Sequence, residues 1–94
     1  MRDLTDEAAI RQTIPLGRAA KGFCGCIERI VVGDAPSSLP AHEIERRLIE
    51  LGFVEGATVQ ILHEGFFGRD PIAVRVNGAT VALRRREAMA IHAF

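Results

Sequence analysis

Two alternating segments separated by Asn77-Gly78 constrain the fold of this chain more than any other feature. Ile72, Val74 and Val76 recur at every second position, as in a strand with one buried face. Asn-Gly favours the two-residue turns with positive φ that match the twist of paired strands. The partner strand is expected over residues 80–85, with Val81 and Leu83 facing inward. The sequence therefore predicts an antiparallel hairpin.

Other segments extend this hairpin into a small sheet. Residues 23–32 predict a strand with a bulge near Arg29, because Ile30, Val31 and Val32 are consecutive apolar residues. Residues 57–64 predict a further strand, residues 65–71 a loop, and residues 91–94 a closing strand. Connections this short favour antiparallel pairing, so we expect a mainly β fold that closes into a small barrel.

One helix is expected between the first two strands. An apolar stripe at helical spacing runs from Ala41 through Ile44 and Leu48 to Leu51, and Gly52 supplies the left-handed cap. Glu43 and Arg47 stand in the favourable order for an i,i+4 ion pair. The predicted core comprises Leu48, Leu51, Phe53, Val54, Val59, Ile61, Ile72, Val74, Val76, Val81 and Leu83.

The composition narrows the classes of function. The chain has 94 residues and equal numbers of acidic and basic side chains, so its formal net charge is zero. Such a small domain leaves little room for a deep substrate pocket, and no nucleophile and base stand at a readable spacing. We therefore expect no enzyme. With no apolar segment near 20 residues and no secretory signal pattern, we expect a cytoplasmic protein without direct membrane insertion.

Several segments, in order, resemble the FeoA family, small cytosolic proteins encoded with the bacterial ferrous iron transporter FeoB. Pro15-Leu16 and Gly22 precede the first strand, and a helix then leads into a Leu-Gly-Phe segment and a glycine. A Gly-Arg-Asp-Pro-Ile segment opens the next strand. The matching segments are 46–56, 68–76 and 81–88, within residues 15–94.

The resemblance implies an SH3-like β-barrel over residues 15–94, with one or two helices inserted after the first strand. Residues 1–14 would form an N-terminal arm or short helix. The resemblance also implies a non-catalytic accessory protein that binds the cytosolic part of a FeoB-type transporter and modulates its activity. Association with the membrane would then occur through the transporter, while self-association is left open.

The loop over residues 65–71 is the first choice for the surface that meets this partner. Phe66 and Phe67 lie between glycines, and we expect one ring to tuck into the barrel end and the other to be exposed. An exposed aromatic side chain on a rigidly held loop is typical of a binding anchor. Arg69 and Asp70 lie beside the rings, so the predicted partner-binding residues are Phe66, Phe67, Arg69 and Asp70.

A second surface is suggested by the basic run at residues 84–86. Arg84 turns away from the buried Leu83, and Arg75 on the paired strand extends the charge across the hairpin. Arg75, Arg84 and Arg85 could dock an acidic surface, or could be solvated charges at a strand end. Nucleic acid is disfavoured, because the later strands carry no aromatic platform.

Cys24 and Cys26 offer two soft ligands on one face of the first strand. Two thiols do not complete a zinc site, and His42, His63 and His92 are far apart in sequence, so a packing role is favoured. A dimer that paired these strands would bring four thiols together. No cofactor is required, although the alternative function is a metal-sensing domain that binds a divalent transition metal such as Fe²⁺ or Zn²⁺. His63 and Glu64 are expected at a solvated strand end.

Overall fold

The computed structural model describes residues 12–32 and 40–94, and their fold is mainly β. The predicted N-terminal arm lies outside this part of the chain up to residue 11. The elements, in chain order, are strand β1 (Ile14–Pro15), 3-10 helix η1 (Leu16–Arg18), strand β2 (Cys24–Ile30), helix α2 (Ala41–Glu50), strands β3 (Thr58–Phe67), β4 (Asp70–Val76) and β5 (Ala79–Leu83), helix α3 (Arg85–Ala88) and strand β6 (Ile91–Ala93).

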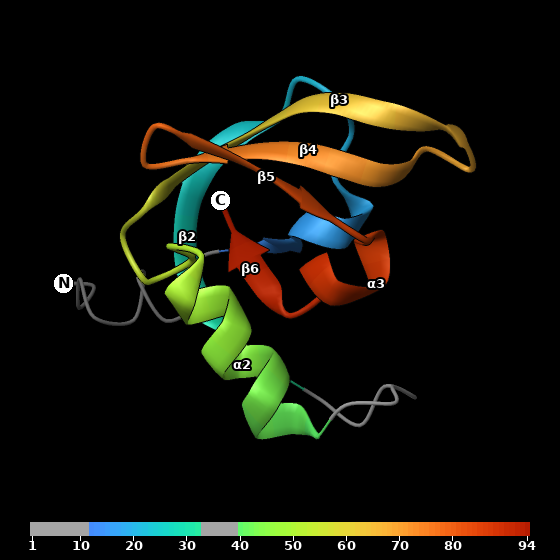
Figure 1. Cartoon of the computed structure of the whole chain (residues 1–94). Coiled ribbons are helices and arrows are strands. Elements are labelled where there is room, and N and C mark those ends of the chain that lie inside the picture. The colour runs from blue at the N-terminus through green and yellow to red at the C-terminus, as the bar shows by residue number, and fades with distance from the viewer. Residues whose placement is uncertain (1–11, 33–39) are drawn as a thin grey trace, which may run out of the picture.

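The six strands in the described part of the chain form one antiparallel sheet in the order β1-β6-β2-β3-β4-β5. The sheet curls around the interior, and α2 lies beside it after β2 (Figure 1). Among the described strands β5 does not pair with β1, so the expected full closure of the barrel was wrong. The cause is local: β1 is only two residues long and passes directly into η1, and β5 passes into α3.

The hairpin predicted at Asn77-Gly78 is confirmed. Asn77 and Gly78 have φ angles of 48° and 85°, as a two-residue turn requires. Val76 pairs with Ala79, and the register continues without interruption to Ile72 and Leu83. The bulge expected near Arg29 is also present, because the register between β2 and β6 shifts between Ile27 and Arg29.

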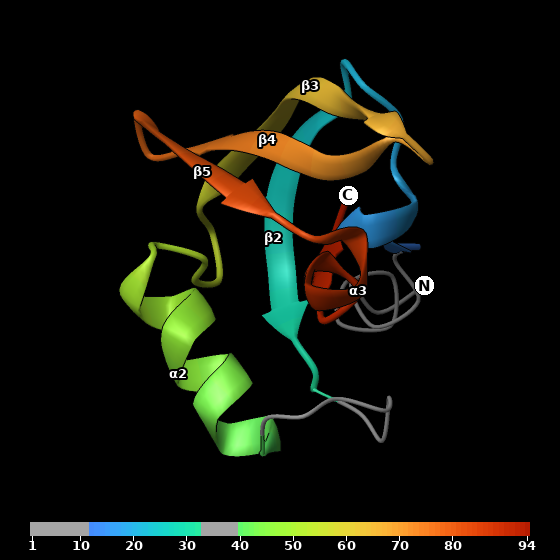
Figure 2. The same ribbon diagram turned by 45° about the vertical axis from the view of Figure 1, so that its right-hand side comes forward.

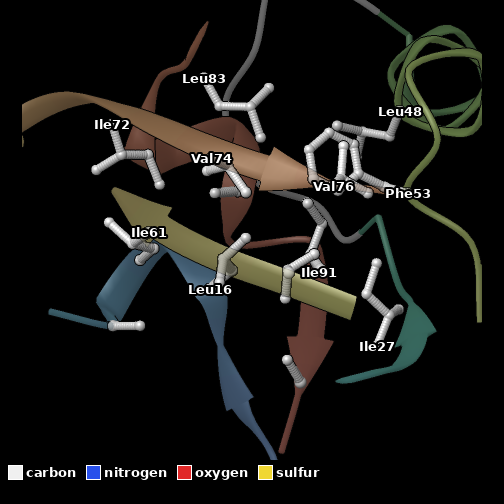
Figure 3. Packing of buried hydrophobic residues seen from close by; sticks show 14 of the residues in the cluster. Leu16, Ile27, Leu48, Phe53, Ile61, Ile72, Val74, Val76, Leu83 and Ile91 are labelled. Atoms are coloured by element: carbon white, nitrogen blue, oxygen red, sulfur yellow. The ribbon is translucent and has the colours of Figure 1, made fainter. Parts of the chain in front are cut away.

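The core lies between the curled sheet, η1 and α2 (Figure 3). Most predicted core residues are buried, but Val54 is 41% exposed and Leu51 and Val81 are only partly buried. Strand alternation identified the central strands well. It did not identify the rest of the core, which consists of Leu16, Ala19, Ile27, Ala57, Ala88, Ala90, Ile91 and Ala93.

Helix α2 contacts the core through a narrow face. Leu48 is buried, Ile44 is partly buried, and Gly52 ends the helix region at φ 107°. Arg47 pairs with Glu87 of α3 at 2.6 Å, so the helix is tied to α3 instead of forming the expected pair with Glu43. No helix within residues 12–32 and 40–94 has the length and apolar character needed to cross a membrane.

Candidate functional site

The segment expected to be a loop is instead the far end of a long hairpin. Strand β3 continues through Gly65, Phe66 and Phe67, and β4 begins at Asp70, so only Gly68 and Arg69 form the turn. The hairpin projects beyond the rest of the sheet in two views (Figures 1 and 2). We call residues 65–70 the hairpin tip. The glycines that indicated a loop are therefore a strand residue and a turn residue.

Backbone geometry explains why glycines are needed here. A Cβ atom on Gly65 would lie 2.1 Å from the Asp70 carbonyl oxygen, so the facing backbones can approach only without a side chain. The register shifts between Glu64 and Phe67, which places a bulge at this point. Gly68 and Arg69 both have left-handed φ angles, 67° and 60°, as a two-residue turn requires.

Both aromatic rings of the hairpin tip are exposed. Phe66 has 101% and Phe67 90% of its reference surface accessible. The expectation that one ring would tuck into the barrel end was wrong, because the bulge carries the tip past the core. Two adjacent exposed phenylalanines form an apolar surface that is unfavourable in water unless a partner covers it.

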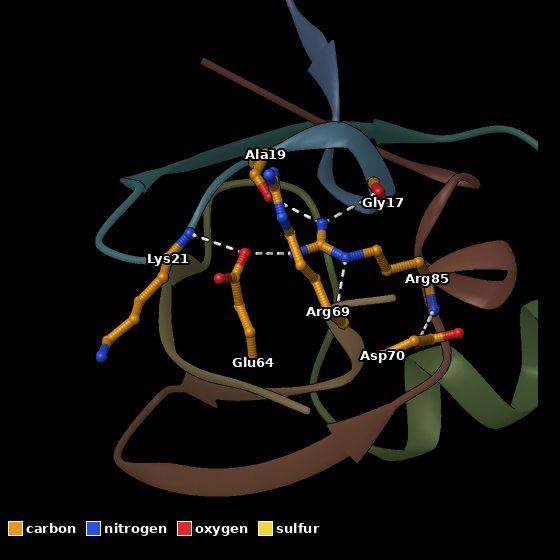
Figure 4. Close-up of polar contacts among 7 residues, drawn as sticks. All are labelled: Gly17, Ala19, Lys21, Glu64, Arg69, Asp70 and Arg85. Carbon is orange, nitrogen blue, oxygen red and sulfur yellow. Dashed lines mark hydrogen bonds and ion pairs between the residues drawn. The ribbon is translucent and has the colours of Figure 1, made fainter. Parts of the chain in front are cut away.

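Arg85 holds the turn end of this hairpin (Figure 4). Its guanidinium donates to the Arg69 carbonyl at 2.8 Å and to the Gly17 and Ala19 carbonyls at 3.1 and 2.7 Å. A fourth bond, at 2.6 Å, joins it to the Glu64 carboxylate, with the two side chains 18% and 21% exposed. One side chain from α3 therefore joins strand β3 and the turn of the hairpin to the segment around η1.

Two further bonds complete this Arg85 cluster. The backbone N–H of Arg85 donates to an Asp70 carboxylate oxygen at 2.8 Å, and the backbone N–H of Lys21 donates to Glu64 at 3.3 Å. Glu64 is thus an internal partner, and its placement at a solvated strand end was wrong. Asp70 also serves the fold, whereas Phe66, Phe67 and Arg69 leave exposed side chains at the tip.

The three arginines of the predicted docking patch separate in the structure. Arg75 is exposed on β4 and pairs with Thr80, and Arg84 is exposed between β5 and α3. Arg85 is turned inward by the bonds above, so it is not part of an exposed patch with the other two. Sequence reasoning missed this role because the side chain of Arg85 bonds to partners 16 to 68 residues away.

The thiols and imidazoles do not converge on a metal site. Cys24 and Cys26 are free, with Cys24 exposed and Cys26 partly buried. Within residues 12–32 and 40–94, no three His, Cys, Asp or Glu side chains gather closely enough to hold an ion. Strand β2 pairs with β3 on one side and, through Cys26 and Phe94, with the C-terminus on the other. The prediction of a dimer that pairs β2 with its copy is therefore wrong, because both sides of β2 already have partners.

His92 is the histidine nearest the core, and β6 places it beside Pro15 and Arg29. Burial lowers its pKa from the ordinary value of 6.5, and the positive charge of Arg29 lowers the pKa further. Both effects favour the neutral imidazole in the folded protein.

The family model of the FeoA domain matches residues 14–93. The chain belongs to the FeoA family. The resemblance inferred from the short sequence segments is thereby confirmed. None of the curated proteins matches the chain.

Solved structures of FeoA proteins have the same fold as this chain. An iron uptake regulatory protein (FeoA) is 26% identical, with 87% of this chain and 96% of that chain covered and a TM-score of 0.69. Stenotrophomonas maltophilia FeoA, in complex with zinc, is 30% identical, with 89% and 91% covered and a TM-score of 0.67. It is described as a prokaryotic SH3 domain protein and a possible bacterial ferrous iron transport activating factor. The SH3-like architecture is thus confirmed for the FeoA fold.

A similar domain occurs within a longer protein. A manganese-dependent transcriptional repressor in complex with manganese is 25% identical, with a TM-score of 0.71. The similarity covers 89% of this chain but only 37% of the repressor. The FeoA fold is therefore also found as one part of a metal-responsive chain.

Proposed function

We propose that this FeoA-family chain is a non-catalytic accessory protein of bacterial ferrous iron uptake that binds the cytosolic part of a FeoB-type transporter. Membership of the family and similarity to an iron uptake regulatory protein support this role. In this proposal the protein acts in the cytoplasm and reaches the membrane only through its partner.

The observation that carries the proposal is the exposure of both Phe66 and Phe67 on a braced hairpin. Burying a phenylalanine against a partner contributes about 1.5–3 kcal/mol. The Arg85 cluster holds the hairpin tip before binding, so little conformational entropy is lost when the rings are covered. Arg69, in the turn itself, can add charge recognition at the rim of the contact.

The activity of the transporter would be modulated if the hairpin tip binds one conformation of the transporter more tightly than another. A bound protein shifts a conformational equilibrium only by the difference between its two affinities. In the proposed mechanism the rings are the source of that difference, and no chemical step takes place on this chain.

The test is calorimetric titration of the isolated cytosolic region of a FeoB-type transporter with the wild-type chain and a Phe66→Ser/Phe67→Ser variant. Loss of two buried rings predicts about a hundredfold weaker binding or more. Ile49→Ser is the matched control, since Ile49 is an exposed apolar residue on α2. Unchanged affinity of the double variant would show that the tip is not the contact.

The alternative, a metal-sensing domain, lacks a ligand set within the described residues. Repeating the titration with and without a chelator separates the two functions. Binding that needs no added Fe²⁺ or Zn²⁺ supports an interaction module that works without metal. Binding that depends on either ion supports metal sensing.

A further inference from the structure

Strand β5 ends the sheet with one side unpaired. Within residues 12–32 and 40–94 it pairs only with β4, and no strand lies beyond it (Figure 2). The opposite edge is β1, which has two residues, whereas β5 has five. Of the two edges, only β5 is long enough to accept another strand.

The register determines which backbone groups face this open side. The two-residue turn makes Val76 and Ala79 exchange both of their backbone hydrogen bonds, and antiparallel pairs then alternate along the strand. Val81 and Leu83 therefore bond toward β4. The N–H and C=O groups of Thr80 and Ala82 point outward, and both residues are exposed.

Strand β5 lacks the features that normally protect an edge. Its sequence, Ala-Thr-Val-Ala-Leu, contains no charge and no proline. Its register with β4 is continuous over five pairs, whereas the β2–β6 and β3–β4 pairings both contain shifts. An uncharged edge with an uninterrupted register is a template for a further strand.

The charges around the edge define the kind of strand that fits. Arg75 stands opposite Thr80 on β4, and Arg84 and Arg86 follow the end of β5, all three exposed. The nearby acids are engaged elsewhere: Glu87 pairs with Arg47, and Asp70 accepts from the backbone of Arg85. The edge therefore has an excess of positive charge, although the whole chain is neutral.

We propose that the β5 edge is a second interaction surface, separate from the hairpin tip, which binds an extended acidic segment of a partner protein as an added strand. Thr80 and Ala82 supply four main-chain hydrogen-bonding groups. Arg75, Arg84 and Arg86 select glutamate- or aspartate-rich sequence. The proposal does not depend on Phe66 or Phe67, so it can fail while the proposed transporter contact holds.

The first test uses the free protein and amide hydrogen exchange measured by NMR. Thr80 and Ala82 are expected to exchange rapidly and Val81 slowly, since only Val81 donates within the sheet. Slow exchange at Thr80 and Ala82, together with a dimer in size-exclusion chromatography, would show that a second copy covers the edge and would overturn the proposal.

The second test adds an eight-residue peptide of alternating glutamate and valine, with a lysine–valine peptide as the control. The glutamate peptide is expected to shift and protect the Thr80 and Ala82 amides, and the effect should weaken as salt is raised. An equal response to both peptides, or none to either, contradicts the proposal.

Variants then test the hydrogen bonds and charges separately. Thr80→Pro removes an outward donor and is compatible with an edge strand, so it should weaken binding of the glutamate peptide at least tenfold without unfolding the chain. Arg75→Ala with Arg84→Ala should weaken it severalfold. If Thr80→Pro does not fold, Ala82→Glu at this exposed position provides the second test, because like charges on neighbouring strands repel each other; full binding of the glutamate peptide by the folded variant would refute the assignment.

Discussion

Phe53 and the pair Phe66-Phe67 present the same side chain in opposite surroundings. Phe53 is completely buried between α2 and the sheet, whereas the other two rings lie almost entirely in solvent. In the interior a ring is held by apolar neighbours on every side. At the hairpin tip the backbone is held instead by the Arg85 cluster, and the rings contact little of the protein.

The contrast between the buried and the exposed rings separates residues that stabilise the fold from residues that are available to bind a partner. A change in the interior should lower the free energy of unfolding, and a change at the rings should leave it nearly unchanged. A change in the Arg85 cluster should affect both the free energy of unfolding and the binding of a partner. Each of the following changes tests this division, beginning with the largest expected loss of stability.

Phe53→Ala should have the largest effect. Truncating a fully buried phenylalanine leaves a cavity and costs about 3–5 kcal/mol, a large part of the total stability of a domain this size. Chemical denaturation monitored by circular dichroism measures this loss. A variant with wild-type stability would mean that the interior is not packed as described.

Arg85→Ala should cost about 2–3 kcal/mol, because it leaves the half-buried Glu64 carboxylate and two or more carbonyls without their donor. Amide exchange at the hairpin tip should also accelerate. Arg85→Lys keeps the charge but not the forked set of donors. It should therefore retain only part of the wild-type stability and of the slow amide exchange at the tip.

Gly65→Ala should cost about 1–3 kcal/mol, because the added methyl group would overlap the Asp70 backbone. The matched control is Gly68→Ala, where the added Cβ meets no neighbouring atom and only the left-handed φ is strained. NMR shifts should change at the tip in the first variant and spare α2. Equal effects of the two substitutions would contradict the close approach of the strands.

Acid should destabilise the fold through His92, which is partly buried on β6. Its pKa is lowered in the folded state, by burial first and by Arg29 second, so the unfolded chain binds the proton more readily. Stability should therefore fall as pH drops below about 6.5, the unfolded value. His92→Gln should flatten this part of the stability curve in urea titrations between pH 7.5 and 5; an unchanged slope would assign it to other groups.

Phe66→Ala and Phe67→Ala should change the stability least, within about 0.5 kcal/mol, because neither ring packs against the core. Thermal melts compared with wild type measure this. A loss above 2 kcal/mol in either variant would place that ring in the interior and remove it from the proposed contact.

Local patterns in the sequence were sufficient to predict much of the sheet. Alternation identified Ile72, Val74 and Val76, and Asn77-Gly78 gave the hairpin. These features depend on neighbours in sequence, which is why they could be read directly. Small core residues such as Ala88 and Ala93 carry too weak an apolar signal to be recognised without the fold.

The shape of the predicted partner-binding segment could not be read from the sequence. Gly65 and Gly68 are compatible with a loop, and equally with a bulge followed by a two-residue turn. Only the position of the facing strand distinguishes these two structures. The Glu64–Arg85 pair joins strand β3 to helix α3, and no periodic pattern identifies such a pair. One of the Phe66 and Phe67 rings was expected to tuck into the barrel end, but both lie on a tip that extends past the core.

The most direct measurement is amide hydrogen exchange of this chain with and without the cytosolic region of a FeoB-type transporter. Protection is expected to appear first at residues 65–70, while α2 is unaffected. Protection confined to α2 or to the strands around Cys24 and Cys26, with the hairpin tip still exchanging freely, would contradict it.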